Sequence, residues 1–420
     1  MSALVPGGEG LARLGDGRIG FVPGGFPGDR IRPVRVQDRR SYLRALTWEL
    51  VHASAERIDP PCPVADTCGG CDWMHLAHKA QLQEKTALLG QALARTGGFD
   101  ALPSTPTVTH LGPTERYRNR LRLHVDCHGK LGLFARRSHE LVAIDDCLVG
   151  PEATRNVLAI LRELAAAQPG CLSTFAVLEL RVAPTEPRIA LRLRPRELNR
   201  TLPLPSRHLV RALSERFAVS VAGQASSPPV EQRWPLGGGV ELTVPTDAFV
   251  QVNWSVNVEL VRRVVSGARQ RNVRSFCDLY CGAGNFSLPL LAAGLEGTAV
   301  DRDQAGVMAA ERTAREGGWS GGTFIVSDVL SELKRLHRHG APFDLLLLDP
   351  PRSGARSLLA TVAALGPRYV ALCACDPVTL ARDSRQLASL GFELEDLCGL
   401  DMFPHTHHFE VLAWFRGPRT

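Results

Sequence analysis

The order of apolar and polar residues divides the chain into regions. From about residue 8 to residue 52, short apolar segments are broken by glycine and proline, a pattern that predicts a small β-barrel. Residues 76–96 carry apolar side chains at helical spacing. Between residues 108 and 244, alternating segments at 120–125 and 188–193 predict strands, and residues 153–167 predict a helix. This middle region is therefore expected to be mixed α+β.

After residue 244, strands and helices alternate. Strands are expected at 275–280, 298–301, 323–326, 345–349 and 369–375, with a helix at 288–293. Continuously apolar strands that alternate with helices predict a parallel, doubly wound sheet of the α/β class. We therefore expect three domains, at residues 1–57, 58–244 and 245–420, with part of residues 76–106 packing on the last one.

Length and composition indicate a globular protein. The chain has 420 residues, 44% hydrophobic and 22% charged, and such a length exceeds the usual size of one core. No apolar segment approaches the roughly 20 residues of a membrane helix, and the first residues do not resemble a secretion signal. Eleven cysteines in such a chain are better explained as metal ligands, reactive thiols and packing residues than as disulfides. We expect a cytoplasmic location and no membrane partner.

Basic residues gather at one point of the sequence. The net charge of +6 permits a polyanionic partner without requiring one. Arg118, Arg120 and Arg122 recur at every second position, so a strand would present them on one face. We interpret this face as a nucleic-acid contact, with an ordinary solvated face as the alternative. Nearly all basic residues of the chain are arginine, so arginine abundance alone is weak evidence.

A glycine-rich loop at residues 278–285 follows a buried-type strand and precedes a helix. Its glycines, including Gly282, let the backbone approach a ligand at the carboxyl end of the strand. Asp301 ends the next strand, about 20 residues after Tyr280, where a carboxylate can accept the hydroxyls of a ribose. Asp328 follows the third strand and is a candidate partner for an adenine amine. The loop lacks a third glycine and a phosphate-binding lysine, which favours S-adenosylmethionine; a glycine turn in an unrelated domain is the alternative.

The fourth strand is followed by Asp349-Pro350-Pro351-Arg352. In methyltransferases that act on amino groups, a similar Asp/Asn-Pro-Pro precedes an aromatic residue that stacks on the target base. Arg352 stands at that position here, which disfavours methylation of an amine.

A cysteine at the end of the fifth strand and a later carboxylate suggest covalent chemistry on a pyrimidine. Carbon 5 of uracil is a poor nucleophile, so its methylation requires that a thiolate first adds to carbon 6 and that a base then removes the carbon 5 proton. Cys375 and Glu410 are the candidates for these roles. A buried strand cysteine is the alternative reading of Cys375, and Cys373 is a rival nucleophile.

Three histidines precede Glu410. Zinc binding by His405, His407 and His408 is one interpretation, but no complementary set of ligands lies nearby in the sequence. The preferred interpretation is that His405 and Thr406 shape the turn.

These motifs together resemble the RNA uracil-5-methyltransferase family over nearly the whole chain. The resemblance is carried by residues 8–10 onward, which are like a TRAM RNA-binding barrel; by Cys62, Cys68 and Cys71; by residues 249–253, 278–285, 349–352 and 375–377; and by the segment ending at Glu410. It implies a class I, Rossmann-like methyltransferase domain with Cys375 as nucleophile and Glu410 as base. The residues that it places around the methyl donor and the base are Gln251, Tyr280, Asp301 and Asp349.

The resemblance also implies a [4Fe–4S] cluster on four cysteines. The ligands would be Cys62, Cys68, Cys71 and Cys147. Four thiolates suit zinc as well as iron and sulfur, so zinc, or no metal, is the alternative. The remaining cysteines are expected to be packing residues, namely Cys127, Cys171, Cys277, Cys281 and Cys398.

One residue departs from the pattern of the family. Its usual Ser-Cys-Asn-Pro reads Ala374-Cys375-Asp376-Pro377 here. A carboxylate beside the thiol would tend to raise the pKa of Cys375 unless Asp376 is neutral or paired.

The barrel and the four cysteines resemble the subgroup that acts on 23S rRNA, which is the expected substrate; the T-loop of tRNA is the alternative. Cytosine-5 methylation would require a cysteine beside proline in residues 349–351, and none is present. A non-catalytic RNA-binding protein would need neither Cys375 nor Glu410. We expect a monomer that binds RNA.

Overall fold

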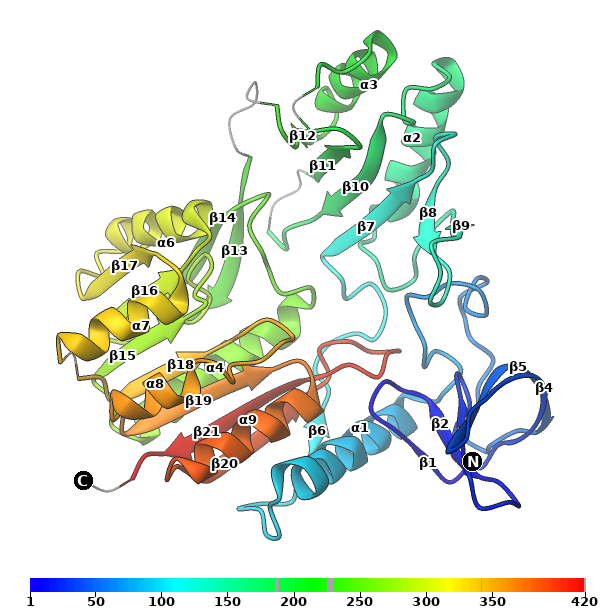
Figure 1. Cartoon of the computed structure of the whole chain (residues 1–420). Coiled ribbons are helices and arrows are strands. Elements are labelled where there is room, and N and C mark those ends of the chain that lie inside the picture. Colours follow the sequence, from blue (N-terminus) through cyan, green and yellow to red (C-terminus); the bar gives the residue numbers. More distant parts are fainter. Residues whose placement is uncertain (186–188, 199, 225–229, 341, 419–420) are drawn as a thin grey trace.

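The computed structural model describes residues 1–185, 189–198, 200–224, 230–340 and 342–418, and the strands of this part form four sheets (Figure 1). The N-terminal sheet has the order β1-β2-β3-β5-β4, and only β3 and β5 pair in parallel. Its strands are β1 (Ala3–Leu4), β2 (Gly10–Arg13), β3 (Ile19–Val22), β4 (Arg30–Asp38) and β5 (Tyr42–His52). The β4–β5 ribbon is largely exposed, and its identity as a TRAM barrel stays a prediction.

The middle sheet has the order β12-β11-β10-β7-β8-β9. Its strands are β7 (Arg120–Val125), β8 (Leu131–Phe134), β9 (Leu141–Ala143), β10 (Phe175–Arg181), β11 (Ala190–Pro195) and β12 (Ala218–Val221). The alternation in β7 buries Leu121, Leu123 and Val125 in a core that also contains residues of helices α2 (Thr154–Ala167) and α3 (Leu204–Ser214). The predicted strand at 188–193 corresponds to β11, and Arg188 lies outside the described residues.

The large sheet carries the C-terminal half. Its order is β17-β16-β15-β18-β19-β21-β20-β6, with β15 to β19 parallel and β21 antiparallel to both neighbours. The strands are β6 (Val108–Thr109), β15 (Ser275–Leu279), β16 (Glu296–Asp301), β17 (Gly322–Val326), β18 (Leu345–Leu348), β19 (Tyr369–Ala374), β20 (Glu393–Leu400) and β21 (Glu410–Arg416). All four residues of β18 are buried leucines, because a central parallel strand is covered on both faces.

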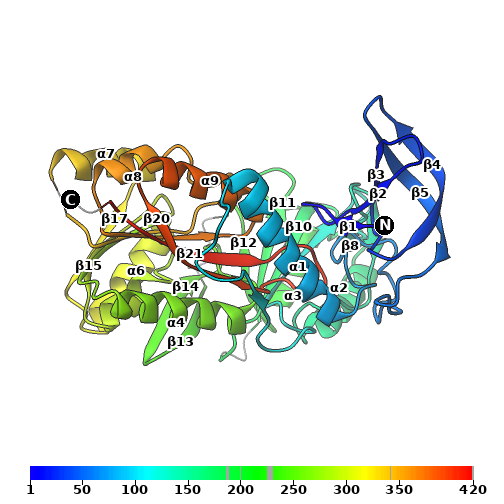
Figure 2. The same ribbon diagram turned by 90° about the horizontal axis from the view of Figure 1, so that it is seen from below.

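Helices cover both faces of this sheet, as Figure 2 shows with α7, α8 and α9 on one side and α4 and α6 on the other. The helices are α1 (His78–Ala92), α4 (Trp254–Gln270), α5 (Ser287–Ala292), α6 (Gln304–Glu316), α7 (Val329–Arg338), α8 (Leu359–Ala364) and α9 (Pro377–Ser389), and a π-helical turn, η1 (Leu93–Gly97), follows α1. Two cores result, one with residues of α4 to α6 and one with residues of α1 and α7 to α9.

Parts of the chain before residue 245 also belong to this half. Leu89, Ala92 and Leu93 of the α1–η1 segment are buried in the core beneath α9, and β6 pairs in parallel with the edge strand β20. The hairpin of β13 (Glu231–Gly237) and β14 (Val240–Pro245) packs its buried face into the other core of the sheet. The expected division at residues 58–244 and 245–420, with part of residues 76–106 packing on the last domain, stays a prediction.

No helix in the described part of the chain is both long enough and apolar enough to cross a membrane.

Candidate active site

Cys375 lies at the carboxyl end of the large sheet. It is the single residue between the end of β19 and Asp376, the N-cap of α9. Its side chain is partly accessible, whereas Cys373 is fully buried in the core. Accessibility therefore favours Cys375 over Cys373 as a nucleophile.

Glu410 lies beside Cys375 across two antiparallel strands. β21 begins at Glu410 and pairs antiparallel with β19, so that Ala374 faces Val411. Continued by one residue, the same register places Cys375 opposite Glu410. Glu410 is buried, and its Oε2 has no hydrogen-bond partner among the described residues. Burial and the nearby Asp349 raise the pKa of Glu410 well above its usual value. The strand register thus brings the two candidate catalytic groups together.

The charge around the thiol is mixed. Burial and, to a smaller extent, Glu410 raise the pKa of Cys375 to about 11, and Arg352 acts in the opposite direction. A thiol with this pKa is almost wholly protonated at neutral pH, although the thiolate is the reactive form. Arg352 is therefore the side chain that favours ionisation of Cys375. The sequence comparison of its position with amino-group methyltransferases did not indicate this effect.

Asp349 and Gln251 meet at the end of β18. Gln251 Nε2 donates a hydrogen bond of 3.3 Å to Asp349 Oδ2. Burial raises the pKa of Asp349 to about 6, and the bond from Gln251 acts in the opposite direction. Both residues line a small cavity of about 40 Å³ together with Tyr280 and Gly282. Four of the six residues predicted to bind the cofactor thus share one cavity.

The glycine loop has the shape that a close ligand requires. Tyr280 and Gly282 have positive φ values of 70° and 53°, and a Cβ added to Gly282 would meet no atom within 4 Å. Asp301 supports the loop, because its Oδ2 accepts the Gly282 N–H at 2.9 Å and its Oδ1 accepts the Asp303 N–H at 2.9 Å. The open backbone at Gly282 and the adjacent carboxylate fit a nucleoside.

Asp328, which is predicted to contact adenine, also caps a helix. It is the N-cap of α7, and its Oδ1 accepts hydrogen bonds from the backbone N–H and the hydroxyl of Ser331 at 3.0 and 2.9 Å. Its contact with adenine stays a prediction.

The four cysteines predicted as metal ligands line one cavity of about 310 Å³, namely Cys62, Cys68, Cys71 and Cys147. Burial raises the pKa of Cys71 to about 12, and Arg118 beside it acts in the opposite direction. Arg136 donates to the carbonyl oxygen of Cys71 at 3.2 Å. Four thiol donors suit an iron–sulfur cluster or zinc, and the cluster stays a prediction.

The three predicted RNA-binding arginines lie around this cavity. Arg118, Arg120 and Arg122 all line it. Arg118 precedes β7 and donates from Nε to the Tyr117 hydroxyl at 3.2 Å, while Arg120 and Arg122 belong to β7. Glu179 lies 3.9 Å from Arg120. The face therefore adjoins the cysteines, and its contact with RNA stays a prediction.

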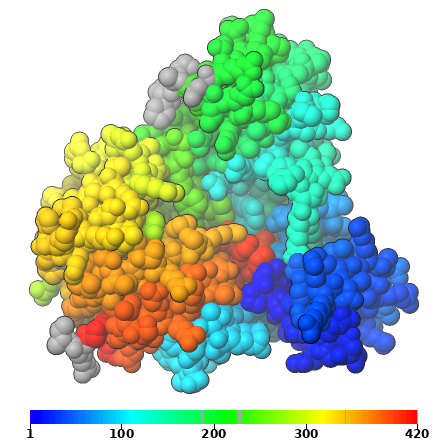
Figure 3. Space-filling model, in the orientation of Figure 1, coloured from blue at the N-terminus to red at the C-terminus, as the bar shows by residue number. Residues whose placement is uncertain are grey.

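A larger cavity of about 780 Å³ is lined in part by Arg352 and by residues of the segment 403–408, which precedes Glu410. Aromatic side chains come from the N-terminal sheet and the residues before Glu410, and arginines come from the middle region and from the turn after β18. The lining includes Trp48, Arg118, Arg136, Arg137, Arg352, Phe403, His407 and His408. In Figure 3 the N-terminal residues, in dark blue, lie directly beside the red C-terminal segment. Segments far apart in the sequence thus form one surface next to the site.

The three histidines before Glu410 contact different partners. His407 Nδ1 contacts Asp72 at 2.5 Å, His405 Nδ1 lies 3.3 Å from Gln81 Nε2, and His408 Nε2 lies 3.4 Å from an Arg352 nitrogen. Among the described residues they form no group of ligands within 4.8 Å. A zinc site on these three residues has no geometric support, whereas His405, with φ of 65°, shapes the turn.

No family model matches the chain. The 23S rRNA (uracil(1939)-C(5))-methyltransferase of Edwardsiella ictaluri is 33% identical over 422 residues, which cover 98% of this chain and 93% of that protein. The enzyme of the same name from Pseudomonas putida is 32% identical and covers 99% and 92%. The chain belongs to the RNA uracil-5-methyltransferase family.

The fold of this methyltransferase agrees with a solved structure. The tRNA (uracil-54, C5)-methyltransferase of Pyrococcus abyssi, in complex with S-adenosyl-L-homocysteine, superposes with a TM-score of 0.75 and 23% identity, covering 99% of each chain. The predicted α/β class with a Rossmann-like C-terminal domain is confirmed. The chain is an RNA uracil-5-methyltransferase that depends on S-adenosylmethionine.

Sequence reasoning missed the residues of this methyltransferase that hold the segment before Glu410. Lys85 and Gln81 of α1 are both fully buried against it. A lysine and a glutamine in a helix are usually exposed to solvent, and no local sequence signal distinguishes these two buried residues from exposed ones.

Proposed function

We propose that this enzyme methylates carbon 5 of a uridine in 23S rRNA, with Cys375 as the nucleophile and Glu410 as the base. The observation that carries the proposal is the strand register, which brings a partly accessible thiol next to a buried carboxylate whose Oε2 has no hydrogen-bond partner among the described residues. Curated relatives of this length that are named for 23S rRNA support the choice of substrate.

The reaction begins at the thiol. The Cys375 thiolate adds to carbon 6 of uracil, and the electron pair of the carbon 5–carbon 6 double bond becomes an enolate that is nucleophilic at carbon 5. S-adenosylmethionine, when bound, would supply the methyl group to carbon 5 through cleavage of its sulfur–methyl bond and would leave as S-adenosylhomocysteine. Arg352 favours this first step because it is the cation that stabilises the thiolate.

The reaction ends at the carboxylate. Glu410 takes the proton from carbon 5, the double bond re-forms, and the carbon–sulfur bond breaks so that its electron pair returns to Cys375. A raised pKa makes the Glu410 carboxylate a stronger base, and it passes the proton to solvent after the RNA has left. The target base must leave its stack to reach both groups, at a cost of a few kcal/mol.

The cavity of about 780 Å³ is the proposed path of the RNA. Trp48, Phe403 and His408 offer ring faces for unstacked bases, and Arg118, Arg136 and Arg137 offer charge for the backbone. Arg120 and Arg122 would extend this path across the face of β7. The path ends at Arg352, next to the thiol.

The cysteine cavity is the proposed site of a [4Fe–4S] cluster. Cys62, Cys68, Cys71 and Cys147 would hold it, and Arg118 and Arg136 would offset the negative charge of four thiolates. Because methyl transfer needs no electron, we assign the cluster a structural and RNA-positioning role. An anaerobic preparation with bound zinc but neither iron nor sulfide would contradict this assignment.

The covalent step is tested with RNA that carries 5-fluorouridine. The wild type should form a denaturation-resistant complex, because fluorine cannot leave as a proton does, and Cys375→Ala should not form it. Cys373→Ala is the matched control and should trap normally. Undiminished trapping by Cys375→Ala would remove the thiol from the mechanism.

The substrate is tested by mapping 5-methyluridine in 23S rRNA and tRNA from cells with and without the gene. Loss of the modification from 23S rRNA alone is expected, and loss from the tRNA T-loop alone would replace rRNA by tRNA. A cytoplasmic location follows from the RNA substrate, and a monomer stays a prediction.

A further inference from the structure

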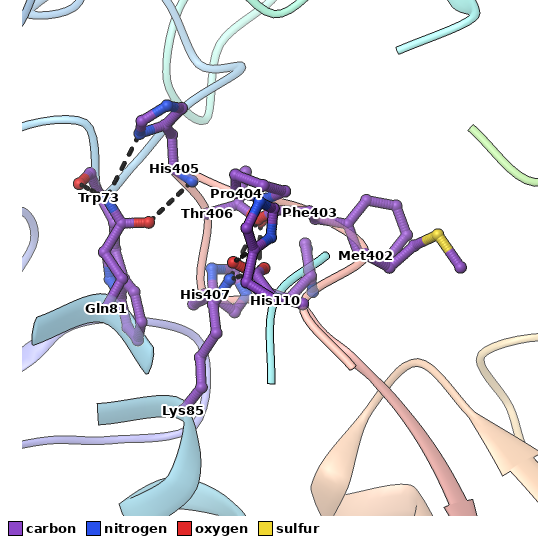
Figure 4. Close-up of polar contacts among 12 residues, drawn as sticks. Trp73, Gln81, Lys85, His110, Met402, Phe403, Pro404, His405, Thr406 and His407 are labelled. Atoms are coloured by element: carbon purple, nitrogen blue, oxygen red, sulfur yellow. Dashed lines mark hydrogen bonds and ion pairs between the residues drawn. The ribbon is translucent and has the colours of Figure 1, made fainter. Parts of the chain in front are cut away.

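Residues 401–408, which lie between β20 and β21, form a segment that is held mainly by residues from the first 253 positions of the chain (Figure 4). The donors to its successive backbone carbonyls come from different elements: Asn253 Nδ2 to Met402 at 3.3 Å, Lys85 Nζ to Phe403 at 3.1 Å, the Tyr117 hydroxyl to Pro404 at 3.1 Å and the Trp73 N–H to His405 at 2.9 Å. This segment ends two residues before Glu410.

Helix α1 makes the strongest of these contacts. His78, Gln81 and Lys85 lie on one face, because residues three to four apart are neighbours on a helix. Gln81 Oε1 accepts the His405 N–H at 2.8 Å. Lys85 Nζ lies 2.5 Å from Asp401 Oδ1 as well as 3.1 Å from the Phe403 carbonyl. The helix buries polar side chains where an amphipathic helix usually buries apolar ones.

Lys85 is the central residue of this contact. Its side chain and that of Asp401 are both completely buried, and a lysine is almost never fully buried unless it is paired. Lys85 is also the only donor that reaches both a side chain and a backbone carbonyl of the 401–408 segment, among the contacts within the described residues. It fixes two points of the segment relative to α1.

A metal site is the competing explanation for part of this cluster. Nitrogen atoms of His78 and His110 and an oxygen of Asp401 all lie within 4.8 Å of one another. However, the Lys85 ammonium already neutralises Asp401, so a divalent cation bound there would sit beside a buried cation. The charge balance is complete without a metal.

We propose that Lys85 is a positioning residue that fixes Glu410 at the substrate by anchoring residues 401–408 to α1. The proposal rests on the proposed role of Glu410 as the base. Glu410 must reach the carbon 5 proton of a ring whose position is set by its bond to Cys375, and a misplacement of about 1 Å can cost about 100-fold in rate. Cys375 itself directly follows β19 and is not part of this segment.

The two catalytic steps should therefore respond differently to Lys85→Met, which keeps an unbranched side chain, one atom shorter, and removes the charge. Trapping by 5-fluorouridine RNA precedes proton removal by Glu410 and should keep its wild-type rate. Release of ordinary methylated RNA needs Glu410, so kcat should fall about 10- to 100-fold with little change in KM, and a covalent RNA adduct should accumulate. Lys79→Met, an exposed lysine on the same helix, is the control and should behave as wild type.

A second variant separates positioning from simple stability. Lys85→Met combined with Asp401→Asn removes both buried charges and so avoids an unpaired carboxylate. If Lys85 positions Glu410, the folded double variant should still accumulate the adduct, because the bond to the Phe403 carbonyl is absent. Recovery of wild-type turnover in the double variant would show that Lys85 only neutralises Asp401, and would overturn the proposal.

Glu410→Gln, measured in parallel, separates the role of Glu410 as the base from its positioning by Lys85. Adduct accumulation in Glu410→Gln but not in Lys85→Met leaves Glu410 as the base and refutes positioning by Lys85. Absence of the adduct in both variants, with normal turnover in Glu410→Gln, refutes the base assignment and with it the proposal.

Discussion

Asp376 Oδ1 accepts the backbone N–H of Thr379 at 2.7 Å, which makes Asp376 the N-cap of α9. The carboxylate beside the candidate nucleophile Cys375 is thus paired with the first turn of a helix whose N1 residue is Pro377. The main causes of the raised pKa of Cys375 are burial and Glu410. The departure from the asparagine of the family is therefore compatible with catalysis, since both residue types cap helices well.

Asp376→Asn should preserve stability and activity, because an amide oxygen can accept the same hydrogen bond. Asp376→Ala should lower the free energy of unfolding by about 1 kcal/mol through loss of the cap. Denaturant unfolding of both variants, together with the rate of 5-fluorouridine trapping, measures the two effects. A several-fold faster trapping rate in Asp376→Asn would show that the carboxylate does oppose ionisation of Cys375.

Arg352→Met should slow the formation of the covalent adduct about tenfold. Arg352 is the group that lowers the pKa of Cys375 against burial and Glu410, and a pKa increase of one unit reduces the thiolate fraction tenfold. The trapping rate at fixed pH measures this effect under saturating RNA. Arg356→Met, an exposed arginine four residues later, is the control for loss of a surface charge.

The rate of trapping should rise with pH. The thiolate is the reactive form, and with the pKa of Cys375 raised to about 11 its fraction increases about tenfold for each pH unit well below that value. A pH series from 7 to 9 with 5-fluorouridine RNA, corrected for RNA affinity, should therefore have a slope near one on logarithmic axes. A plateau within this range would mean that bound RNA lowers the pKa of the thiol.

Asp301→Ala should weaken binding of S-adenosylmethionine by about 10-fold or more. The substitution removes the acceptor that fixes the Gly282 and Asp303 N–H groups, and loss of such charge-assisted bonds costs about 1.5–3 kcal/mol. Calorimetric titration measures the dissociation constant. Asp328→Asn, which can still cap α7, is the informative comparison, because weaker binding there would show that the Asp328 carboxylate meets the nucleoside.

Much of the fold could be predicted because its signals are local. β18 consists of four consecutive leucines, and an uninterrupted apolar run of this kind is typical of a strand that is covered on both faces. Cys375 and Glu410 were identifiable as residue types in suitable contexts. Their adjacency was not, since it depends on the register of β21 between β19 and β20.

Other features depend on contacts between distant segments. Lys85 lies in a helix whose polar face suggests solvent, and only the fold shows that Asp401 is its partner. The β13–β14 hairpin alternates like any exposed ribbon, yet it completes the core of the methyltransferase sheet. Burial by a remote partner leaves no mark on the spacing of residues, so neither feature was predictable.

The pairing of β6 with β20 has a consequence for the integrity of the enzyme. Val108 and Thr109 bond to the outer strand of the large sheet, beside Gly399 and Leu400. An uncovered edge presents free backbone donors and acceptors on which another chain can add a strand. A catalytic half cut away from its first 109 residues would bare that edge, so the N-terminal region also protects the sheet from self-association.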